Sequence, residues 1–266
     1  MAAYATITVE DQGPVARVTL NLPDKRNPIS PTMCGELLDA FKAIQAHVIV
    51  LTGAGKVFSA GGDLAGMQAD PAPRQDPGGP GLPEAPGVPP ASLVELFTAM
   101  HDLGKPVIAM VNGHALAGGL GLMVACDLVV ASDTAQFGTT EISVGLWPMM
   151  ITAELARSVG RKQVLEMMLT GKKLSAAEAV ACGLVNRAVP ADRLAAETMA
   201  LATEIAGRSP AAIRLGLRAF YRSQDMEHEP QLRYLQGELG RVLALDDAKE
   251  GIAAFLQKRA PIWKGK

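Results

Sequence analysis

Two segments of this chain repeat one design, in which an apolar run leads into a turn rich in glycine. The first is the run 48–52 with the turn 58–64, Phe-Ser-Ala-Gly-Gly-Asp-Leu; the second is the run 107–111 with the turn 112–119, Asn-Gly-His-Ala-Leu-Ala-Gly-Gly. Each run is typical of a buried strand, and each turn is typical of a chain that opens a helix. Glycine allows close backbone approach, and the N–H groups that begin a helix lack an intrahelical partner. If the two turns face each other, they form an oxyanion hole, a pair of N–H donors around one oxygen that gains negative charge.

The rest of the first 190 residues also alternates between strand and helix patterns. Residues 4–10 and 15–20 predict a hairpin around a turn at 11–13, and residues 31–46 predict a helix. Residues 128–131 form a third buried apolar run. Strands that alternate with helices indicate an α/β fold in which most strands pair in parallel.

The character of the chain changes near residue 190, which divides it into a predicted core, 1–190, and a helical region, 191–266. The helical region contains no strand pattern and four predicted helices, at 191–206, 210–223, 230–243 and 246–258. Its apolar positions, among them Phe220, Leu239 and Phe255, exceed what a lone helical tail would expose. We therefore expect this region to pack on the core or on another subunit.

Composition excludes several classes of protein. The net charge of −2 offers no electrostatic case for a nucleic-acid partner. The three cysteines, Cys34, Cys126 and Cys182, are odd in number and widely spaced, so we expect free thiols and a reducing cytoplasm. The four histidines lack metal-ligand spacing, and no apolar run is long enough to span a bilayer, so we expect neither a metal nor a membrane partner.

Residues 70–90 interrupt the pattern, because eight of them are proline and four are glycine. That composition is incompatible with a core element and predicts a mobile loop. The position of the loop, soon after the first glycine turn, favours a lid or a pocket rim. An inert insertion is the alternative.

Six segments, in order and at matching spacing, resemble the crotonase superfamily, also called the enoyl-CoA hydratase/isomerase family. They are 24–28, 58–64, 112–119 with Cys126-Asp127, 136–141 with 145–148, 169–185 and 250–259. The resemblance covers most of the chain and implies a spiral of ββα repeats with a C-terminal helical trimerisation region. It also implies acyl-CoA thioesters as substrates, no cofactor beyond the CoA of the substrate, and assembly as a homotrimer or a dimer of trimers.

The resemblance further implies roles for individual residues. The N–H groups of Gly62 and Gly118 would hold the thioester oxygen while the neighbouring carbon loses a proton and an enolate forms. Lys25, Arg26 and Lys258 would meet the phosphates of CoA, although each alone is also typical of a solvated surface charge. The other substrate contacts that the resemblance implies are Ala60, Asp63, Leu64, Trp147 and Phe255. Among all these residues, Phe255 and Lys258 would reach the CoA of a neighbouring subunit.

Glu141 is the candidate acid–base residue. It lies in a stretch with few other charges, between Phe137-Gly138 and Val144-Gly145-Leu146. Partial desolvation there would raise the pKa of its carboxyl toward working pH, which suits proton transfer. From the residues alone, the alternative is a surface glutamate or one that caps the turn at 139–141.

One departure from the family concerns a second glutamate. The two-glutamate hydratases of the family carry it three residues after the second oxyanion glycine, where this chain has Gly121. A glycine can neither give a proton nor hold a water, whereas one carboxylate suffices to move a proton between two carbons. Residues 149–152, Met-Met-Ile-Thr, replace a glycine-rich turn of those hydratases and predict an apolar acyl pocket. Hydration of 2-enoyl-CoA and isomerisation of 3-enoyl-CoA, in metabolism of the fatty-acid type, both stay open.

A different class of function is a non-catalytic acyl-CoA-binding protein of the same fold. The missing glutamate and the proline-rich loop are compatible with it. Glu141 argues against it, because a pure binder gains nothing from a desolvated charge. The turn at 53–56 is not a phosphate loop, since the downstream Gly-Lys-Ser/Thr pattern is absent.

Overall fold

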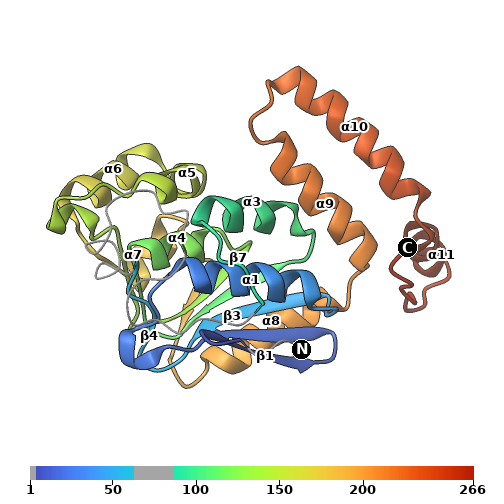
Figure 1. Ribbon diagram of the computed structural model, residues 1–266. Coiled ribbons are helices and arrows are strands. Elements are labelled where there is room, and N and C mark those ends of the chain that lie inside the picture. The colour runs from blue at the N-terminus through green and yellow to red at the C-terminus, as the bar shows by residue number, and fades with distance from the viewer. Residues whose placement is uncertain (1–3, 63–86) are drawn as a thin grey trace.

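A computed structural model, which describes residues 4–62 and 87–266, arranges six strands in one large sheet (Figure 1). The strand order is β1-β2-β3-β5-β7-β10, with bounds Ile7–Gln12, Val15–Leu20, Val48–Gly53, Val107–Val111, Leu128–Ser132 and Arg187–Val189. The pair β1 and β2 is antiparallel, and the other pairings in this sheet are parallel. The mostly parallel α/β fold that the alternating pattern predicts is confirmed.

The first hairpin turns later than its sequence pattern suggests. β1 continues to Gln12, and the turn falls at Gly13 and Pro14 instead of residues 11–13. Gly13 has a φ of 76°, which glycine adopts without steric cost. The Asp11 side chain accepts a hydrogen bond from the Gly13 N–H at 3.0 Å, so it stabilises the turn while its backbone stays in the strand.

Side chains of the central strands alternate between the two faces of the sheet, and both faces are covered. In β5, Val107, Ala109 and Val111 belong to the main hydrophobic cluster, whereas Ile108 and Met110 belong to a second cluster on the opposite face. All five side chains are buried. A strand buried on both faces needs no polar side, which explains the unbroken apolar runs.

Helices cover both faces of this sheet, and α4 (Gly118–Val124) contributes Leu120, Leu122 and Met123 to the main cluster. α1 (Pro31–Ala43) and α3 (Leu93–Leu103) pack into the main cluster, whereas α8 (Leu194–Ala206) packs with Leu194 and Ala202 against the other face (Figure 1). α1 ends three residues before the predicted end, because Ile44 adopts an extended backbone. α8 thus packs directly against the large sheet, although it belongs to the helical region predicted for residues 191–266.

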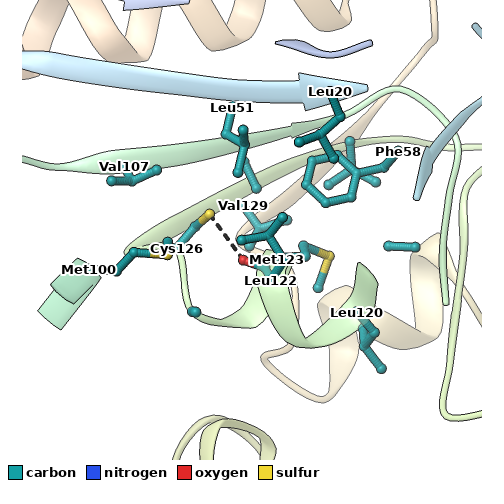
Figure 2. Packing of buried hydrophobic residues seen from close by; sticks show 14 of the residues in the cluster. Leu20, Leu51, Phe58, Met100, Val107, Leu120, Leu122, Met123, Cys126 and Val129 are labelled. Carbon is teal, nitrogen blue, oxygen red and sulfur yellow. Dashed lines mark hydrogen bonds between the residues drawn. The ribbon is translucent and has the colours of Figure 1, made fainter. Parts of the chain in front are cut away.

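A second, smaller sheet was not visible as a separate element in the sequence pattern. It has the order β4-β6-β8-β9, with bounds Val57–Ser59, His114–Leu116, Gln136–Gly138 and Leu174–Ser175. β4, β6 and β8 pair in parallel, and each directly follows a strand of the large sheet. Phe58 of β4 packs in the cluster that holds Leu20 and Leu51 of the large sheet (Figure 2). The two sheets therefore share one core.

Asn112 joins the turns of the two repeats. Its Oδ1 accepts a hydrogen bond from the Gly53 N–H at 3.2 Å, and its Nδ2 donates to the Gly55 carbonyl at 3.0 Å. The next residue must be glycine, because a Cβ on Gly113 would lie 2.1 Å from the Lys56 carbonyl oxygen. The Asn-Gly turn thus joins the end of β5 to the turn that follows β3.

Apart from the short helix η1 (Pro23–Lys25), the remaining helices of the described residues begin at Gly118 or later. They are α4 (Gly118–Val124), η2 (Glu141–Val144), α5 (Met149–Ser158), α6 (Arg161–Thr170), α7 (Ala176–Ala181), α9 (Pro210–Ser223), α10 (His228–Ala244) and α11 (Asp246–Leu256). α10 and α11 project away from the sheets (Figure 1). α10 has no buried residue, and Leu232, Leu239 and Leu243 on it are exposed. Within residues 4–62 and 87–266, no helix has the length and apolar character needed to cross a membrane.

Candidate active site

Gly62 and Gly118 lie side by side where the two glycine turns meet. A Cβ built on Gly118 would lie 3.5 Å from the Gly62 nitrogen and 3.8 Å from the Gly61 carbonyl carbon. Gly118 is the first residue of α4. Within the described parts of the chain, neither the Gly62 N–H nor the Gly118 N–H donates a backbone hydrogen bond. Two adjacent unpaired donors are the arrangement that an oxygen gaining negative charge requires.

The backbone before Gly118 has an unusual conformation that brings the turns together. Ala117 has a φ of 47° and a ψ of −130°, which a residue with a Cβ rarely adopts. Its N–H donates to the Gly138 carbonyl at 2.9 Å, and its carbonyl accepts from the Gly121 N–H at 3.1 Å. Gly61 cannot carry a side chain, because its Cβ would lie 2.6 Å from the Ala117 Cβ. Hydrogen bonds on both sides therefore fix Ala117 in this conformation.

Glu141 begins the short helix η2 and points its carboxylate into an apolar region. Its backbone carbonyl accepts a hydrogen bond from the Leu146 N–H at 3.0 Å, which closes the turn. Its Oε2 is buried and finds no hydrogen-bond partner among the described residues. Burial raises the pKa of the Glu141 carboxyl, and a hydrogen bond from its own backbone N–H opposes this in part. The carboxyl group thus meets the N–H of the first residue of η2, while Oε2 stays without a partner among the described residues.

One cavity of about 170 Å³ brings Glu141 together with Gly62 and Gly118. The rest of its lining is apolar and consists of Ile29, Leu93, Ala117, Leu146, Trp147, Pro148, Met149, Met150 and Ile151. The first turn of α5 supplies part of this wall, in line with the apolar pocket that residues 149–152 predict. A carboxylate with a raised pKa and a pair of N–H donors thus face one apolar space.

The position of the missing second glutamate is filled. A Cβ on Gly121 would lie 2.1 Å from Ile151 Cγ2 and 3.4 Å from Phe97 Cζ. Ile151 is 2% exposed and lines the cavity as well. The site therefore lacks both a carboxylate at residue 121 and the space to hold one.

Replacing Gly121 by glutamate should unfold the site instead of adding an acid to it. The overlap with Ile151 and the burial of an unpaired carboxylate should lower the free energy of unfolding by about 4 kcal/mol. Urea unfolding followed by circular dichroism measures this loss. The Gly121→Glu, Ile151→Ala double variant removes the closest overlap and should recover part of the stability. A single variant as stable as the wild type would contradict this packing.

The turn that holds Lys25 and Arg26 lies against the first glycine turn. Both side chains are exposed. The Arg26 carbonyl accepts a hydrogen bond from the Ala60 N–H at 3.0 Å. Next to Arg26, the buried Asn27 donates through Nδ2 to three carbonyls of residues 54–58, at 2.9 to 3.1 Å. Arg26 is thus held against Ala60 of the first glycine turn, but Lys25, Arg26 and Ala60 do not line the cavity, and Asn27 is a structural residue.

Replacing Asn27 by alanine should lower the free energy of unfolding by about 3 kcal/mol, because buried polar groups lose their partners. These groups are the three carbonyls and the Leu22 N–H, which donates to Asn27 Oδ1 at 2.9 Å. The φ of 53° at Asn27 adds to the cost, since alanine tolerates it less well than asparagine. Urea unfolding beside the exposed control Lys56→Ala tests this. Equal midpoints for both variants would refute it.

Phe255 and Lys258 are not brought to this cavity within one chain. α11 lies at the opposite end of the molecule from α5 (Figure 1). Phe255 is 82% exposed, and Lys258 follows the helix in an exposed turn. Their role at the CoA of a neighbouring subunit stays a prediction. Asp63 and Leu64 lie outside the described residues, as does most of the proline-rich loop, 70–86.

The remaining polar residues considered in the sequence are one histidine of the second glycine turn and the three cysteines. His114 Nδ1 accepts a hydrogen bond from the Gln136 N–H at 3.2 Å, which places His114 in the small sheet. Cys34, Cys126 and Cys182 are free thiols. In the part of the chain that the structure describes, no group of three or more His, Cys, Asp or Glu side chains could hold a metal ion.

The two mostly parallel sheets, the facing glycine turns and the helical C-terminal region together define the crotonase fold. A crystal structure of enoyl-CoA hydratase from Mycobacterium smegmatis matches with a TM-score of 0.85 and 32% identity, over 97% of this chain and 98% of that one. The crystal structure of human enoyl Coenzyme A hydratase domain-containing protein 3 matches with a TM-score of 0.86 and 33% identity, over 97% and 100%.

Sequence comparison gives the same assignment. Residues 10–266 match the family model described as "Enoyl-CoA hydratase/isomerase". A "Putative enoyl-CoA hydratase" of Thermus thermophilus is 40% identical over 261 residues, which cover 94% of this chain and 98% of that protein. The chain belongs to the enoyl-CoA hydratase/isomerase family, as its six motifs predict. It is therefore an enzyme of the hydratase or isomerase type.

Sequence reasoning missed several residues that shape the cavity. Ile29 and Leu93 carry no signal beyond their hydrophobicity. The strain at Ala117 cannot be read from an alanine. Ile151 is the exception, because the sequence shows both a residue without a side chain at Gly121 and a bulky segment at 149–152. In the structure, Ile151 of that segment packs directly against Gly121.

Proposed function

We propose that this enzyme converts 3-enoyl-CoA thioesters into 2-enoyl-CoA thioesters. Glu141 takes a proton from carbon 2, the double bond moves, and the same proton is delivered to carbon 4. The N–H groups of Gly62 and Gly118 hold the thioester oxygen while it bears the negative charge of the enolate. No cofactor is required beyond the CoA that is part of the substrate.

One observation carries the proposal: Glu141 lines one cavity with Gly62 and Gly118, and neither its buried Oε2 nor the two N–H groups have a hydrogen-bond partner among the described residues. A carboxylate with a raised pKa is matched to taking up and returning a proton. Isomerisation is favoured over hydration because Ile151 fills the space beside Gly121. That apolar wall offers no group to orient a water.

The test compares two substrates by ultraviolet absorbance of the conjugated thioester. With 3-hexenoyl-CoA the absorbance should rise, and with crotonyl-CoA it should stay nearly constant. Loss of absorbance from crotonyl-CoA at a comparable rate would establish hydration, the activity in the relatives' names, and would overturn the preference for isomerisation. Binding of both thioesters with no turnover would support the non-catalytic alternative.

The rate of isomerisation should depend on pH through Glu141. The first step needs the deprotonated carboxylate, and burial raises the pKa of this group above its ordinary value. The value of kcat/KM should therefore be constant at high pH and fall as the pH drops through the raised pKa. A pH profile between pH 4 and 9 measures the midpoint. A midpoint at or below the ordinary value for glutamate would contradict the assignment.

We propose three further properties that accompany this function. Lys25 and Arg26 bind the phosphates of CoA, supported by their exposed position beside the first glycine turn. The exposed apolar residues of α10 and α11 form a homotrimer interface that brings Phe255 and Lys258 to a neighbouring subunit. The free thiols support a reducing compartment such as the cytoplasm.

A further inference from the structure

A second cavity adjoins the candidate active site and is larger. Its volume is about 420 Å³, against about 170 Å³ for the first, and the two share Met149 and Met150. Residues of α3, α5 and α9 line it, and Figure 1 shows α3 between the other two helices. Met149 is 68% exposed and Met150 is 47% exposed. Because methionine side chains are flexible, they can move aside for a chain that passes from one cavity to the other.

One part of the second cavity is apolar. Val94 and Phe97 of α3 line it together with Met149, Met150 and Ala153 of α5. This part suits the methylene groups of an acyl chain, because it removes them from water.

Another part of the second cavity is polar and rigid. His101 Nε2 lies 3.2 Å from Glu154 Oε2, and the His101 ring stacks on Tyr221 with centroids 4.2 Å apart and planes 9° from parallel. The Tyr221 hydroxyl donates to Asp127 Oδ1 at 2.7 Å, and Asp127 Oδ2 accepts from the Val107 N–H at 2.7 Å. The backbone of β5 thus fixes the orientation of the polar wall.

Glu154 has an unused acceptor on this wall. The residue is only 9% exposed, and Oε2, bonded to His101, is its one side-chain oxygen with a partner among the described residues. An alkyl chain that covered Oε1 would remove its water and return no hydrogen bond. A hydroxyl group would donate to it. A carboxylate would be repelled, and the nearby Arg222 is already paired with Asp102 at 3.2 Å.

We propose that the second cavity is a subsite for the far end of the acyl group, and that this end carries a hydroxyl or a similar neutral hydrogen-bond donor. This assignment rests on the proposed function, since it names the acyl class that the site accepts. The methylene groups pass Met149 and Met150, and the donor pairs with Glu154.

The test measures binding of unreactive, saturated acyl-CoAs to the full-length protein by calorimetry. Twelve-carbon acyl-CoA is compared with its 12-hydroxy analogue, and with a four-carbon acyl-CoA that cannot reach the second cavity. The hydroxylated chain should bind about fivefold more tightly than the plain chain, the worth of one added hydrogen bond. Equal or weaker binding of the hydroxylated chain would overturn the proposal.

Variants assign the preference to Glu154. Glu154→Met keeps the length of the side chain and removes the acceptor, so it should abolish the preference for the hydroxylated chain. Glu154→Gln keeps an acceptor oxygen and should retain it. The control Glu166→Met, at an exposed position on α6, should also retain it. A preference that survives in Glu154→Met would refute the role of Glu154.

A further variant guards against misfolding of Glu154→Met. Val94 is 60% exposed on α3, so Val94→Trp should fold and fill part of the second cavity. It should weaken binding of both twelve-carbon chains by about tenfold relative to the four-carbon chain. Equal effects on all three ligands would overturn the subsite. Isomerisation of 3-hexenoyl-CoA, measured in parallel, shows whether the proposed function survives if the subsite fails.

Discussion

Replacing Glu141 by glutamine should lower kcat for the isomerisation of 3-hexenoyl-CoA by about a thousandfold, within the range found for general acid–base catalysis. Glutamine has nearly the same shape, but it can neither accept the proton from carbon 2 nor return it to carbon 4. The KM should change little, because the N–H groups of Gly62 and Gly118 and the apolar wall remain. Stopped-flow and steady-state absorbance of the 2-enoyl product measure both constants.

The fold of Glu141→Gln should be intact, and its thermal midpoint should be equal to or above that of the wild type. Within the part of the chain that the structure describes, Glu141 Oε2 is buried and has no hydrogen-bond partner, so removal of the charge relieves a desolvation cost. Glu166→Gln, an exposed change on α6, is the matched control and should keep full activity. If Glu141→Gln kept more than a tenth of the wild-type kcat, Glu141 would not be the proton carrier.

Replacing Gly118 by alanine should lower kcat by about a hundredfold to a thousandfold, the loss typical of an impaired oxyanion hole. The added Cβ would lie 3.5 Å from the Gly62 nitrogen, so the methyl group would occupy the space between the two donors. That distance is ordinary van der Waals contact, so the backbone need not move. The N–H groups remain, but the thioester oxygen can no longer approach both of them.

The stability of Gly118→Ala should match that of the wild type or exceed it slightly, because alanine is the better helix residue. Gly216→Ala on α9 is the matched control, since a Cβ there meets nothing within 4 Å. It should raise stability by up to about 1 kcal/mol without a change in kcat. Full activity of a folded Gly118→Ala variant would show that these two N–H groups do not hold the reacting oxygen.

Much of the fold was predictable because its strands and helices carry strong local signals. β5 and α9 have the bounds that their patterns predict, at 107–111 and 210–223. The short strands β4, β6 and β8 were not predicted, because three residues are too few to show a period. α8 reads as a helix in sequence, but only its packing shows that it covers the large sheet.

The candidate site also has a part that the sequence predicts and a part that only the structure shows. The two glycine turns and the isolated carboxylate of Glu141 stand out in an apolar sequence, and the resemblance to the family named Gly62 and Gly118 as the N–H donors. Their presence in one cavity depends on contacts between residues that lie far apart in the chain. The fit of Ile151 against Gly121 depends on how α5 packs against α4, and neither residue alone predicts it.

The sequence by itself determined the family, the two glycine turns, the acid–base candidate and the absence of a second glutamate at Gly121. All of these can be read from residue types and their spacing, because the backbone preference and the chemistry of a residue are local properties. The tertiary structure alone decided that Glu141 Oε2 is buried with no partner among the described residues and that Ile151 fills the space beside Gly121. It also decided that a larger cavity, lined in part by Glu154, adjoins the first. The physical reason is that burial, desolvation and cavity volume arise from close packing between distant segments, which no local pattern encodes.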